Sequence, residues 1–445
     1  MKYKIKHLVI GLSAVALLTG VLAGCGNNDG NQTPPTDNGT TGTSTSLAGV
    51  TLNIALANQP YSDQLKAAVP EFEQLTGAKV DLSIYTDENL AQLYNVKMNA
   101  KSDEIDVLMY RPLQDTLLMN KNGWLADLTQ RVTDAGSDWQ WDDFIQSSRD
   151  SVTVNGKVVG VPTGTETAVM YYRTDLLAEI GKDYPKTTDE LAADVALIHA
   201  KHPDIFAFAG RGEKSAAVTQ ISSFLYGFGG NWVDANGKAS VDTPEAIAAF
   251  NYYGGLIHDY GPPGATDMNW PEVMGLFQQG LVAFYPEGSS QYNGTIDPTK
   301  STVIGKVGVG PIPAGPAGEH PYNITNFALG VSAYSKNQDA AWQFVQWATN
   351  KANVLKFQQN NVAGARTSVW NDPTGTADLA PDLLATIQHN GPIGVGYDRP
   401  VLISVAAARE VVGVPIVTAI QGGDVAAAAK AANPQFQALL DQDGM

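Results

Sequence analysis

The sequence predicts an α/β fold of two domains, each with a mixed, mostly parallel sheet flanked by helices. Three observations lead to this prediction. Strand-like and helix-like patterns alternate over residues 51–120, an order typical of right-handed β-α-β units. A strand-like run stops at Pro162-Thr163 and resumes at Ala168, as expected where a chain passes from one domain to another. The chain has 445 residues, enough for two domains.

Side-chain spacing defines the elements of the first region. Apolar residues alternate in the strands, as Leu52, Ile54 and Leu56 do, and recur every three or four residues in the helices. Gly77 is a helix stop signal. The expected elements are strands at 51–57, 79–85 and 105–109, with helices at 63–76, 90–98 and 113–120.

Residues 155–177 contain the break between the two domains. Asn155-Gly156 indicates a hairpin, because both residues tolerate a positive φ. Valines follow, then a polar gap at 163–167, then a second strand-like run at 169–172. Glu166 stands in the gap, where it is either a ligand contact at the domain joint or a solvated loop residue.

Two helix starts are marked in the second region. Thr243, followed by Pro244, is an N-cap with proline at the first helical position. Ser335 and Gln338 have the spacing of a capping box ahead of an apolar helix. Trp342 and Trp347 in that helix, like Trp124 earlier in the chain, are expected in the core. A further strand is expected at 328–333.

The amino terminus has the pattern of a lipoprotein signal peptide. Lysines at positions 2, 4 and 6 precede an apolar stretch at 8–22 that is short for a bilayer span. The sequence LAGC then ends at Cys25 and is similar to a lipobox, so residues 1–24 are expected to be removed and Cys25 lipidated. The alternative is ordinary signal cleavage beside a coincidental cysteine, but Cys25 is the only cysteine in the chain.

Residues 25–47 are expected to form a flexible linker, because 27–46 contain no aliphatic residue. A protein tethered in this way suits a cell with a single membrane, which favours a Gram-positive source. Loss of three signal-peptide lysines takes the formal charge from −17 to −20. Such acidity argues against nucleic acid and against direct binding to anionic lipid.

Most catalytic and metal signatures are missing from the sequence. It contains no G-x-S-x-G, H-E-x-x-H or Walker A pattern. Residues 234–237 resemble the start of a calcium loop but lack its closing acidic residue, so a turn is expected. His199 and His202 are expected at the surface end of a helix. We therefore expect no cofactor and no metal.

The remaining chemistry suits neutral polyhydroxylated ligands. Their hydroxyl groups both donate and accept, so carboxylates, arginine forks and amides bind them, and aromatic rings pack on their C–H faces. Polar turns, helix caps and structural ion pairs remain the alternatives for each candidate. The candidates at predicted strand ends, loops and the domain joint are Asn58, Gln59, Tyr110, Arg111, Glu166, Trp270 and Asn326.

Several stretches occur in the order found in one known family. They are DVLMYRPLQDTLLMNKNGWLADL (106–128), GKVVGVP (156–162), FGGNW (228–232), LFQQGLVAFYPEG (276–288), SKNQDAAWQFVQWAT (335–349) and AGARTSV (363–369). The chain thus resembles the family 1 extracellular solute-binding proteins, the sugar- and polyol-binding components of ABC importers related to the maltose-binding protein. The resemblance covers about residues 50–430 and is closest to the branch associated with polyols and simple sugars.

The resemblance implies a periplasmic-binding-protein-like fold with hinge crossovers. It places residues 48–161 and 305–350 in lobe 1 and residues 162–304 and 351–445 in lobe 2, with 307–309 as a strand that returns to lobe 1. It supports Glu166 as a ligand contact at the crossover. The further ligand-binding candidates that it implies are Arg211, Tyr285, Glu287 and Arg366. Tyr285 stands where polyol-binding relatives have tryptophan, and a structural ion pair is an equally good interpretation of Arg366.

The resulting prediction is a lipid-anchored, monomeric receptor on the extracellular face of the cell membrane. It captures a sugar or polyol between two lobes and delivers it to the permease of an ABC importer. The alternatives are a lipid-anchored carbohydrate-active enzyme, with Glu166 and Glu287 as its paired carboxylates, and a sugar sensor or adhesin without transport. Enzymatic activity is not expected.

Overall fold

The computed structural model of the chain describes residues 46–360 and 362–444. It contains two helix-flanked sheets, so the prediction of a two-lobe α/β fold is confirmed. Cys25, the signal peptide and almost all of the linker lie outside the described residues. Within the described ranges, no helix is both long and apolar enough to cross a membrane.

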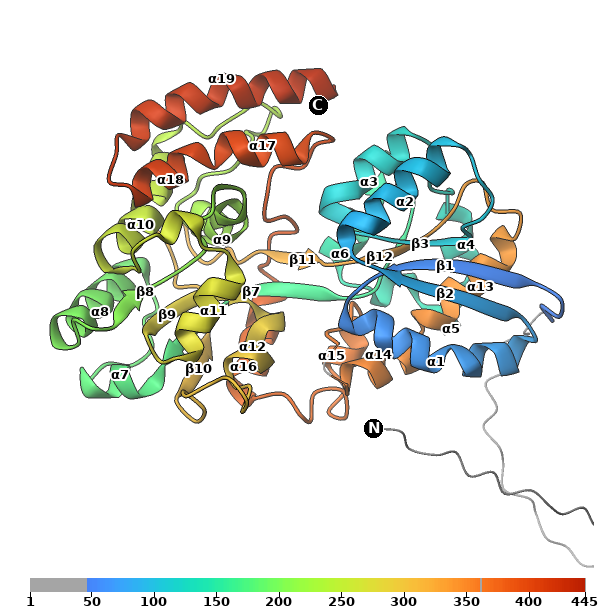
Figure 1. Cartoon of the computed structure of the whole chain (residues 1–445), viewed down its shortest axis with the longest axis horizontal. Helices are drawn as coiled ribbons and strands as arrows, with labels where there is room; N and C mark the ends of the chain where they lie inside the picture. Colours follow the sequence, from blue (N-terminus) through green and yellow to red (C-terminus); the bar gives the residue numbers. More distant parts are fainter. Residues whose placement is uncertain (1–45, 361, 445) are drawn as a thin grey trace, which may run out of the picture. The chain divides into compact units, whose positions relative to one another are not determined.

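The first lobe is built on a five-stranded sheet of order β2-β1-β3-β12-β6. β1 pairs in parallel with β2 and β3, whereas β12 runs antiparallel to β3 and β6. Figure 1 shows α2 and α3 on one face of this sheet and α1 with α14 on the other. The strands are β1 (Thr51–Ala57), β2 (Lys79–Tyr85), β3 (Val107–Tyr110), β6 (Val161–Pro162) and β12 (Ala328–Val331). The helices are α1 (Pro60–Thr76), α2 (Asp87–Asn99), α3 (Pro112–Lys121), α4 (Thr129–Asp134), α5 (Gly136–Trp139), η1 (Trp141–Asp143), α6 (Gln146–Ser151), α13 (Gln338–Ala348), α14 (Lys351–Gln358) and α15 (Thr367–Trp370).

The second lobe is built on a sheet of order β10-β7-β9-β8, with β11 also paired to β7. Its pairs are antiparallel except β8 with β9, so parallel pairing is less common than the sequence predicted. The strands are β7 (Thr165–Arg173), β8 (Phe206–Phe208), β9 (Val282–Gly288), β10 (Val307–Gly310) and β11 (Asn323–Thr325). The helices are α7 (Thr174–Glu179), α8 (Thr188–Lys201), α9 (Lys214–Gly227), α10 (Pro244–Tyr260), η2 (Ala265–Asp267), α11 (Trp270–Gln278), η3 (Ser289–Gln291), α12 (Tyr292–Thr295), α16 (Pro381–Asn390), α17 (Val405–Val412), α18 (Val414–Ile420) and α19 (Val425–Asp443).

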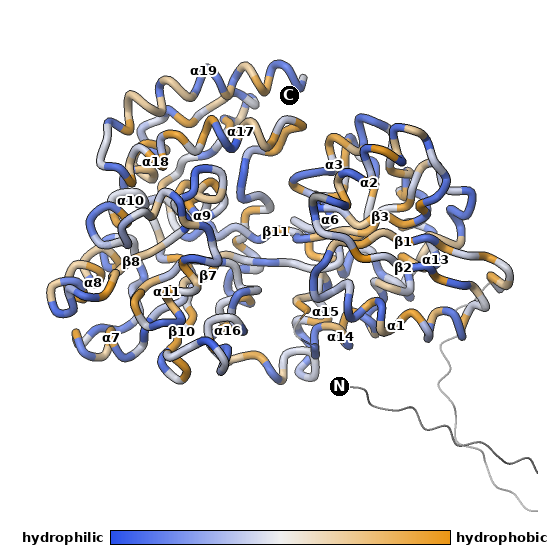
Figure 2. The backbone as a smooth tube through the Cα atoms, viewed as in Figure 1, coloured by the Kyte–Doolittle hydropathy of each residue, from blue (hydrophilic) through white to orange (hydrophobic). Residues whose placement is uncertain are grey.

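Alternation along β7 explains why both faces of the second sheet are covered. Met170 belongs to the core beneath α8, α9 and α10, whereas Val169 and Tyr171 belong to the core beneath α11 and α16. Successive side chains of a strand point to opposite faces, so a strand buried on both sides reads as a continuous apolar run. Outer helices such as α8 instead alternate hydrophobic and hydrophilic residues, as Figure 2 shows.

Local signals in the sequence are confirmed where the partners are close along the chain. Asn155 and Gly156 have φ values of 51° and 76° and form the turn between the short strands β4 (Thr153–Val154) and β5 (Lys157–Val158). Thr243 caps α10 by accepting from the amide of Ala246 at 3.3 Å. The prediction of a capping box at Ser335 is wrong. α13 begins after Asn337, and the hydroxyl of Ser335 binds Asp106 instead.

The expected return of residues 307–309 to the first lobe is also wrong. β10 pairs with β7 in the second sheet, and the chain crosses back only between β11 and β12. Residues after 350 do not leave the first lobe at once, because Phe357, Val362 and Ala365 belong to its core. Short apolar strands look alike in sequence, so pairing partners alone decide which sheet they join.

Candidate ligand-binding site

Two chain crossings meet at the centre of the site. Thr163 and Gly164 carry the chain from β6 to β7, and Asn326 and Phe327 carry it back from β11 to β12. Thr163 donates from its amide and its hydroxyl to the carbonyl oxygen of Phe327, at 2.9 Å in each case. The amide of Asn326 donates to the carbonyl oxygen of Gly164 at 3.2 Å. The predicted domain joint is therefore a real crossing, although Glu166 already belongs to β7.

A third segment packs against the first crossing. Thr165 donates from its amide to the carbonyl oxygen of Ala363 at 3.2 Å and from its hydroxyl to that of Gly364 at 3.1 Å. A Cβ atom on Gly164 would lie 2.8 Å from the Ala363 oxygen. Gly164 therefore allows a backbone approach that a side chain would block.

A pocket of about 500 Å³ opens beside these crossings. We call it the crossover pocket. Its lining mixes hydroxyl, amide and aromatic groups from both lobes, and Gln59, Trp270 and Asn326 are the sequence candidates among them. The lining residues are Gln59, Pro60, Tyr61, Thr163, Gly164, Thr165, Trp270, Ser290, Gln291, Asn326, Phe327, Val362 and Ala363.

Helix starts position two of these side chains. The side chain of Gln59 accepts from the amide of Tyr61 at 3.2 Å, so this residue caps α1 as well as lining the pocket. Asn269 accepts from the amide of Trp270 at 2.8 Å, and Glu272 accepts from the amide of Asn269 at 3.0 Å. This capping box fixes the backbone of Trp270, whose residue remains 40% exposed.

Glu166 lies directly behind the pocket wall. Its carboxylate accepts from the hydroxyl of the pocket residue Ser290. A Cβ atom on Gly288 would lie 2.0 Å from Glu166 Oε1, so a side chain at this position would force the carboxylate to move. Burial raises the pKa of Glu166 and Glu287 raises it further, while Ser290 and Arg211 act in the opposite direction.

Arg211 and Glu287 form a buried pair near Glu166, outside the pocket lining. Arg211 donates from Nε to Glu287 Oε2 at 2.8 Å and from Nη2 to Oε1. Glu287 is 1% exposed and also accepts from the hydroxyl of Tyr285 at 3.1 Å and from the amide of Gly288 at 2.8 Å. Burial disfavours the charged form of Arg211, but Glu287 outweighs this effect and raises the pKa of Arg211.

A second buried pair was missed by the sequence reasoning. Arg399 donates from Nε and Nη2 to the two carboxylate oxygens of Asp398, at 2.5 Å each. Burial alone would raise the pKa of Asp398, but Arg399 and Arg409 lower it to about 2. The signal available in the sequence was weak: two adjacent opposite charges after the glycines of residues 391–396.

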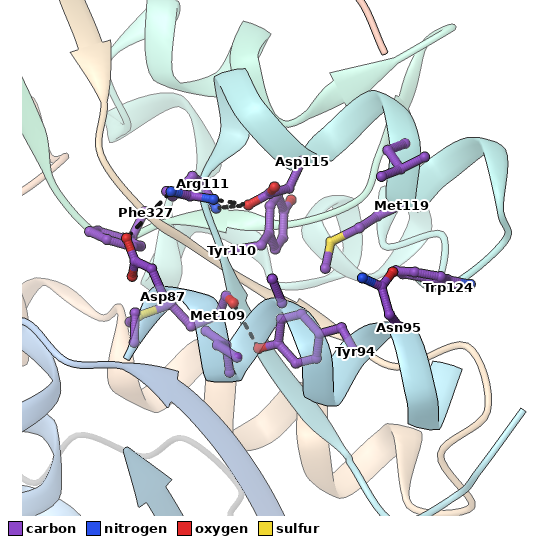
Figure 3. Close-up of a pocket in the computed structure, with 14 residues that line it drawn as sticks. Asp87, Tyr94, Asn95, Met109, Tyr110, Arg111, Asp115, Met119, Trp124 and Phe327 are labelled. Atoms are coloured by element: carbon purple, nitrogen blue, oxygen red, sulfur yellow. Dashed lines mark hydrogen bonds and ion pairs between the residues drawn. The ribbon is translucent and has the colours of Figure 1, made fainter. Parts of the chain in front are cut away.

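Figure 3 shows where Tyr110 and Arg111 lie, around a small cavity of about 80 Å³ between α2 and α3. Arg111 bridges Asp87 at 3.3 Å and Asp115 at 3.5 Å. Tyr110 is 2% exposed, and its hydroxyl packs against Gly160. Phe327 lines both this cavity and the crossover pocket, so the cavity adjoins the pocket from the first lobe.

The remaining candidates lie apart from the pocket lining. Asn58 is exposed, and its backbone amide donates to the backbone carbonyl oxygen of Tyr85 at 2.8 Å. Tyr285 is fully buried behind Glu287. Arg366 is also fully buried, where Nε donates to the carbonyl oxygen of Thr349 at 2.8 Å and Nη1 pairs with Asp143 at 3.1 Å. Its surroundings match the structural ion pair that the sequence left open.

Comparison with known proteins finds a matching family model and relatives of similar sequence. The family model of bacterial extracellular solute-binding proteins matches residues 58–354, more than half of the chain. A probable ABC transporter-binding protein of Deinococcus radiodurans is 30% identical over 334 residues, which cover 68% of this chain and 76% of the relative. A mannitol-binding protein of Pseudomonas aeruginosa is 25% identical over 334 residues and 73% of each chain.

Solved structures agree with the sequence relatives. A solute-binding protein of Agrobacterium radiobacter in complex with ribitol is 26% identical, has a TM-score of 0.75 and covers 89% of this chain and 100% of its own. A maltose-bound Thermotoga maritima protein is 25% identical, with a TM-score of 0.74. These relatives are binding proteins rather than enzymes. The chain belongs to the family of bacterial extracellular solute-binding proteins.

Proposed function

We propose that this protein captures a neutral polyol or simple sugar in the crossover pocket and delivers it to the permease of an ABC importer. The observation that carries the proposal is the composition of the pocket and of the wall behind it. Hydroxyl and amide groups line the pocket with Trp270 and Phe327, and no charged side chain is among its lining residues. Beyond Glu166, the carboxylate of Glu287 is paired with Arg211 and that of Asp398 with Arg399.

This lining favours an uncharged ligand. A pocket lined by uncharged groups, near carboxylates that are paired with arginines, presents no strong net field, so a charged solute gains little from it. Hydroxyl groups can instead accept from the arginines and donate to the carboxylates. The relatives that bind mannitol and ribitol support this class of ligand.

A thermal-shift screen tests the proposal directly. Ribitol, D-mannitol, erythritol, maltose and glucose are compared with D-ribonate and with a polyamine. A ligand that binds only the native state raises Tm by mass action, and a concentration of 100 Kd corresponds to about 2.7 kcal/mol. We expect a neutral polyol or sugar to give the largest shift, with calorimetric affinity that depends weakly on salt. A preferred ion with steep salt dependence contradicts the proposal.

The wall also argues against the enzyme alternative. A retaining glycosidase needs a free carboxylate nucleophile beside an acid, but both oxygens of Glu287 accept hydrogen bonds from Arg211. We therefore propose binding without turnover. Recovery of each bound sugar unchanged after long incubation is the expected result, and product formation would favour the enzyme.

Lipid anchoring completes the proposal and rests on the sequence alone. Cys25 is proposed to carry the lipid and to hold a monomeric receptor at the extracellular face of a Gram-positive membrane, tethered by residues 25–47. Cys25→Ser is expected to release the mature protein into the medium. Unchanged membrane retention, with no lipid mass on Cys25, would contradict it.

A further inference from the structure

Three arginines of the second lobe hold a carboxylate in the same way. Arg173, Arg211 and Arg399 each donate from Nε and Nη2 to the two oxygens of one acidic side chain. This two-point geometry leaves Nη1 as the remaining nitrogen of each fork. The partner of Nη1 therefore distinguishes the three arginines.

Arg173 uses its remaining nitrogen within the fold. Its Nη1 donates to the carbonyl oxygen of Gly280 at 3.0 Å. Arg211 and Arg399 make no such bond from Nη1 to a described residue, and neither atom is buried. Their side chains are 15% and 18% exposed, against 9% for Arg173. Each therefore keeps donor groups that the protein itself does not use.

Helix α9 links the two open arginines. Thr219 of α9 accepts from Arg399 Nη2 at 3.3 Å, and the side chain of the next residue, Gln220, donates to the carbonyl oxygen of Pro286. Pro286 directly precedes Glu287, the partner of Arg211. Thr219 and Gln220 are consecutive in α9, so one turn of this helix supports both forks, and the two guanidiniums are close enough to interact electrostatically.

Acceptors lie beside these donors. The carboxylate of Glu166 interacts electrostatically with both Arg211 and Asp398, and Tyr322 does so with both arginines. Ser290 occupies only one oxygen of Glu166. Unused donor groups of two guanidiniums and an acceptor of one carboxylate are therefore close to one another.

We propose that Arg399 is a further ligand-binding and specificity-determining residue, which acts with Arg211 and Glu166 to select neutral ligands that carry a run of at least three hydroxyl groups. Two hydroxyls accept from the free edges of the arginines, and a third donates to Glu166. The inference rests on the proposed function and adds a residue that the sequence did not suggest. Asp398 and Glu287 cancel the charges of the two arginines, so an anion is not preferred.

Substitution of Arg399 by lysine tests this role. Arg399→Lys keeps the charge next to Asp398 but removes the planar fork. Arg173→Lys is the matched control, because it makes the same change where Nη1 serves only the fold. Calorimetric titrations use ribitol, its monodeoxy analogues, D-mannitol and D-ribonate. We expect Arg399→Lys to weaken ribitol binding about tenfold or more and Arg173→Lys to leave affinity within about twofold while lowering Tm.

The deoxy analogues separate recognition from a structural effect. In the wild type, one analogue is expected to lose about tenfold in affinity, and in Arg399→Lys the same analogue should bind about as well as ribitol. This ratio survives even if the variant is less stable. Equal ribitol affinity in the two lysine variants, or an unchanged analogue ratio, overturns the role of Arg399.

Failure of the proposed function gives a different result. If the wild type binds D-ribonate far more tightly than ribitol, the neutral ligand class is wrong. The role of Arg399 is then retained only if Arg399→Lys abolishes ribonate binding. If the wild type binds none of the probes, the proposed ligand class fails, and the hydroxyl-run inference fails with it.

Discussion

Arg366 in the first lobe and Arg211 in the second are both paired with a carboxylate, but their other N–H groups meet different surroundings. Arg366 is fully buried, donates to two backbone carbonyl oxygens and lies over the ring of Phe144 at 4.0 Å. Arg211 keeps an open edge beside Glu166. A charged pair enclosed on all sides supports the fold, whereas a pair with an unused edge is available to a ligand.

The largest effect is expected where the pair is enclosed. Arg366→Met leaves the carbonyl oxygen of Thr349 without its donor and removes the cation paired with Asp143, which keeps only its bonds from Ser368, so we expect a loss of about 3–5 kcal/mol in the free energy of unfolding. Urea denaturation measures it. Arg131→Met, which breaks the exposed pair with Asp339, should cost less than about 1 kcal/mol. Weakened ligand binding by a folded Arg366→Met protein would show that the contrast is false.

Substitutions of Glu166 test whether the groups beside the open edge of Arg211 bind the ligand. A hydrogen bond to a charged group contributes about 1.5–3 kcal/mol, so Glu166→Ala should weaken ligand binding by about 10- to 150-fold. Glu166→Gln should cost less, because it keeps one acceptor. Gly288→Ala should also weaken binding, because its methyl group displaces the carboxylate. Calorimetry decides: affinities within about twofold of wild type for both Glu166 variants remove this residue from the site.

The raised pKa of Glu166 adds a pH test of the same residue. A carboxylate that must be ionised to accept from a ligand loses this role as pH falls through its folded pKa. We therefore expect wild-type affinity to begin falling at a pH above the ordinary range of a glutamate. Glu166→Gln should bind with an affinity that does not change over this range. A flat wild-type profile would show that ionised Glu166 is not needed.

Asp398, the partner of Arg399, is expected to make the stability of the protein depend on pH. Its pKa falls from 3.8 to about 2, so the stability it contributes is present above pH 3.8 and is lost as pH falls towards 2. The difference corresponds to about 2 kcal/mol. Asp398→Asn should lower stability at neutral pH and flatten its dependence on pH between these limits. Exposed Asp138→Asn is the control, and identical pH profiles for both variants would contradict this assignment.

Trp270 is expected to give the smallest effect. An aromatic contact contributes about 0.5–1.5 kcal/mol beyond area burial, so Trp270→Ala should weaken ligand binding by about 2- to 12-fold with little change in Tm. Val414→Ala removes a similarly exposed apolar side chain far from the pocket lining and should change neither quantity. Loss of stability without loss of affinity would make Trp270 a structural residue like Arg366.

The turns, helix caps and strands that depend on neighbouring residues could be predicted from the sequence. The hairpin at Asn155-Gly156, the cap at Thr243 and the strands at 51–57 and 79–85 are confirmed, because each depends on residues close along the chain. The prediction was wrong where a side chain binds a partner that is distant in the sequence. Ser335 binds Asp106 across 229 positions of sequence instead of capping α13.

The sequence by itself determined that the chain forms two α/β lobes and that it crosses between them beside Glu166, because side-chain periodicity and turn residues act locally. Only the tertiary structure decided which lobe β10 joins and which arginines keep an open edge. Arg211, Arg366 and Arg399 carry the same side chain, and nothing within a few residues of each tells a free N–H group from a buried one. That property depends on the carbonyl oxygens and carboxylates that distant segments bring to each guanidinium.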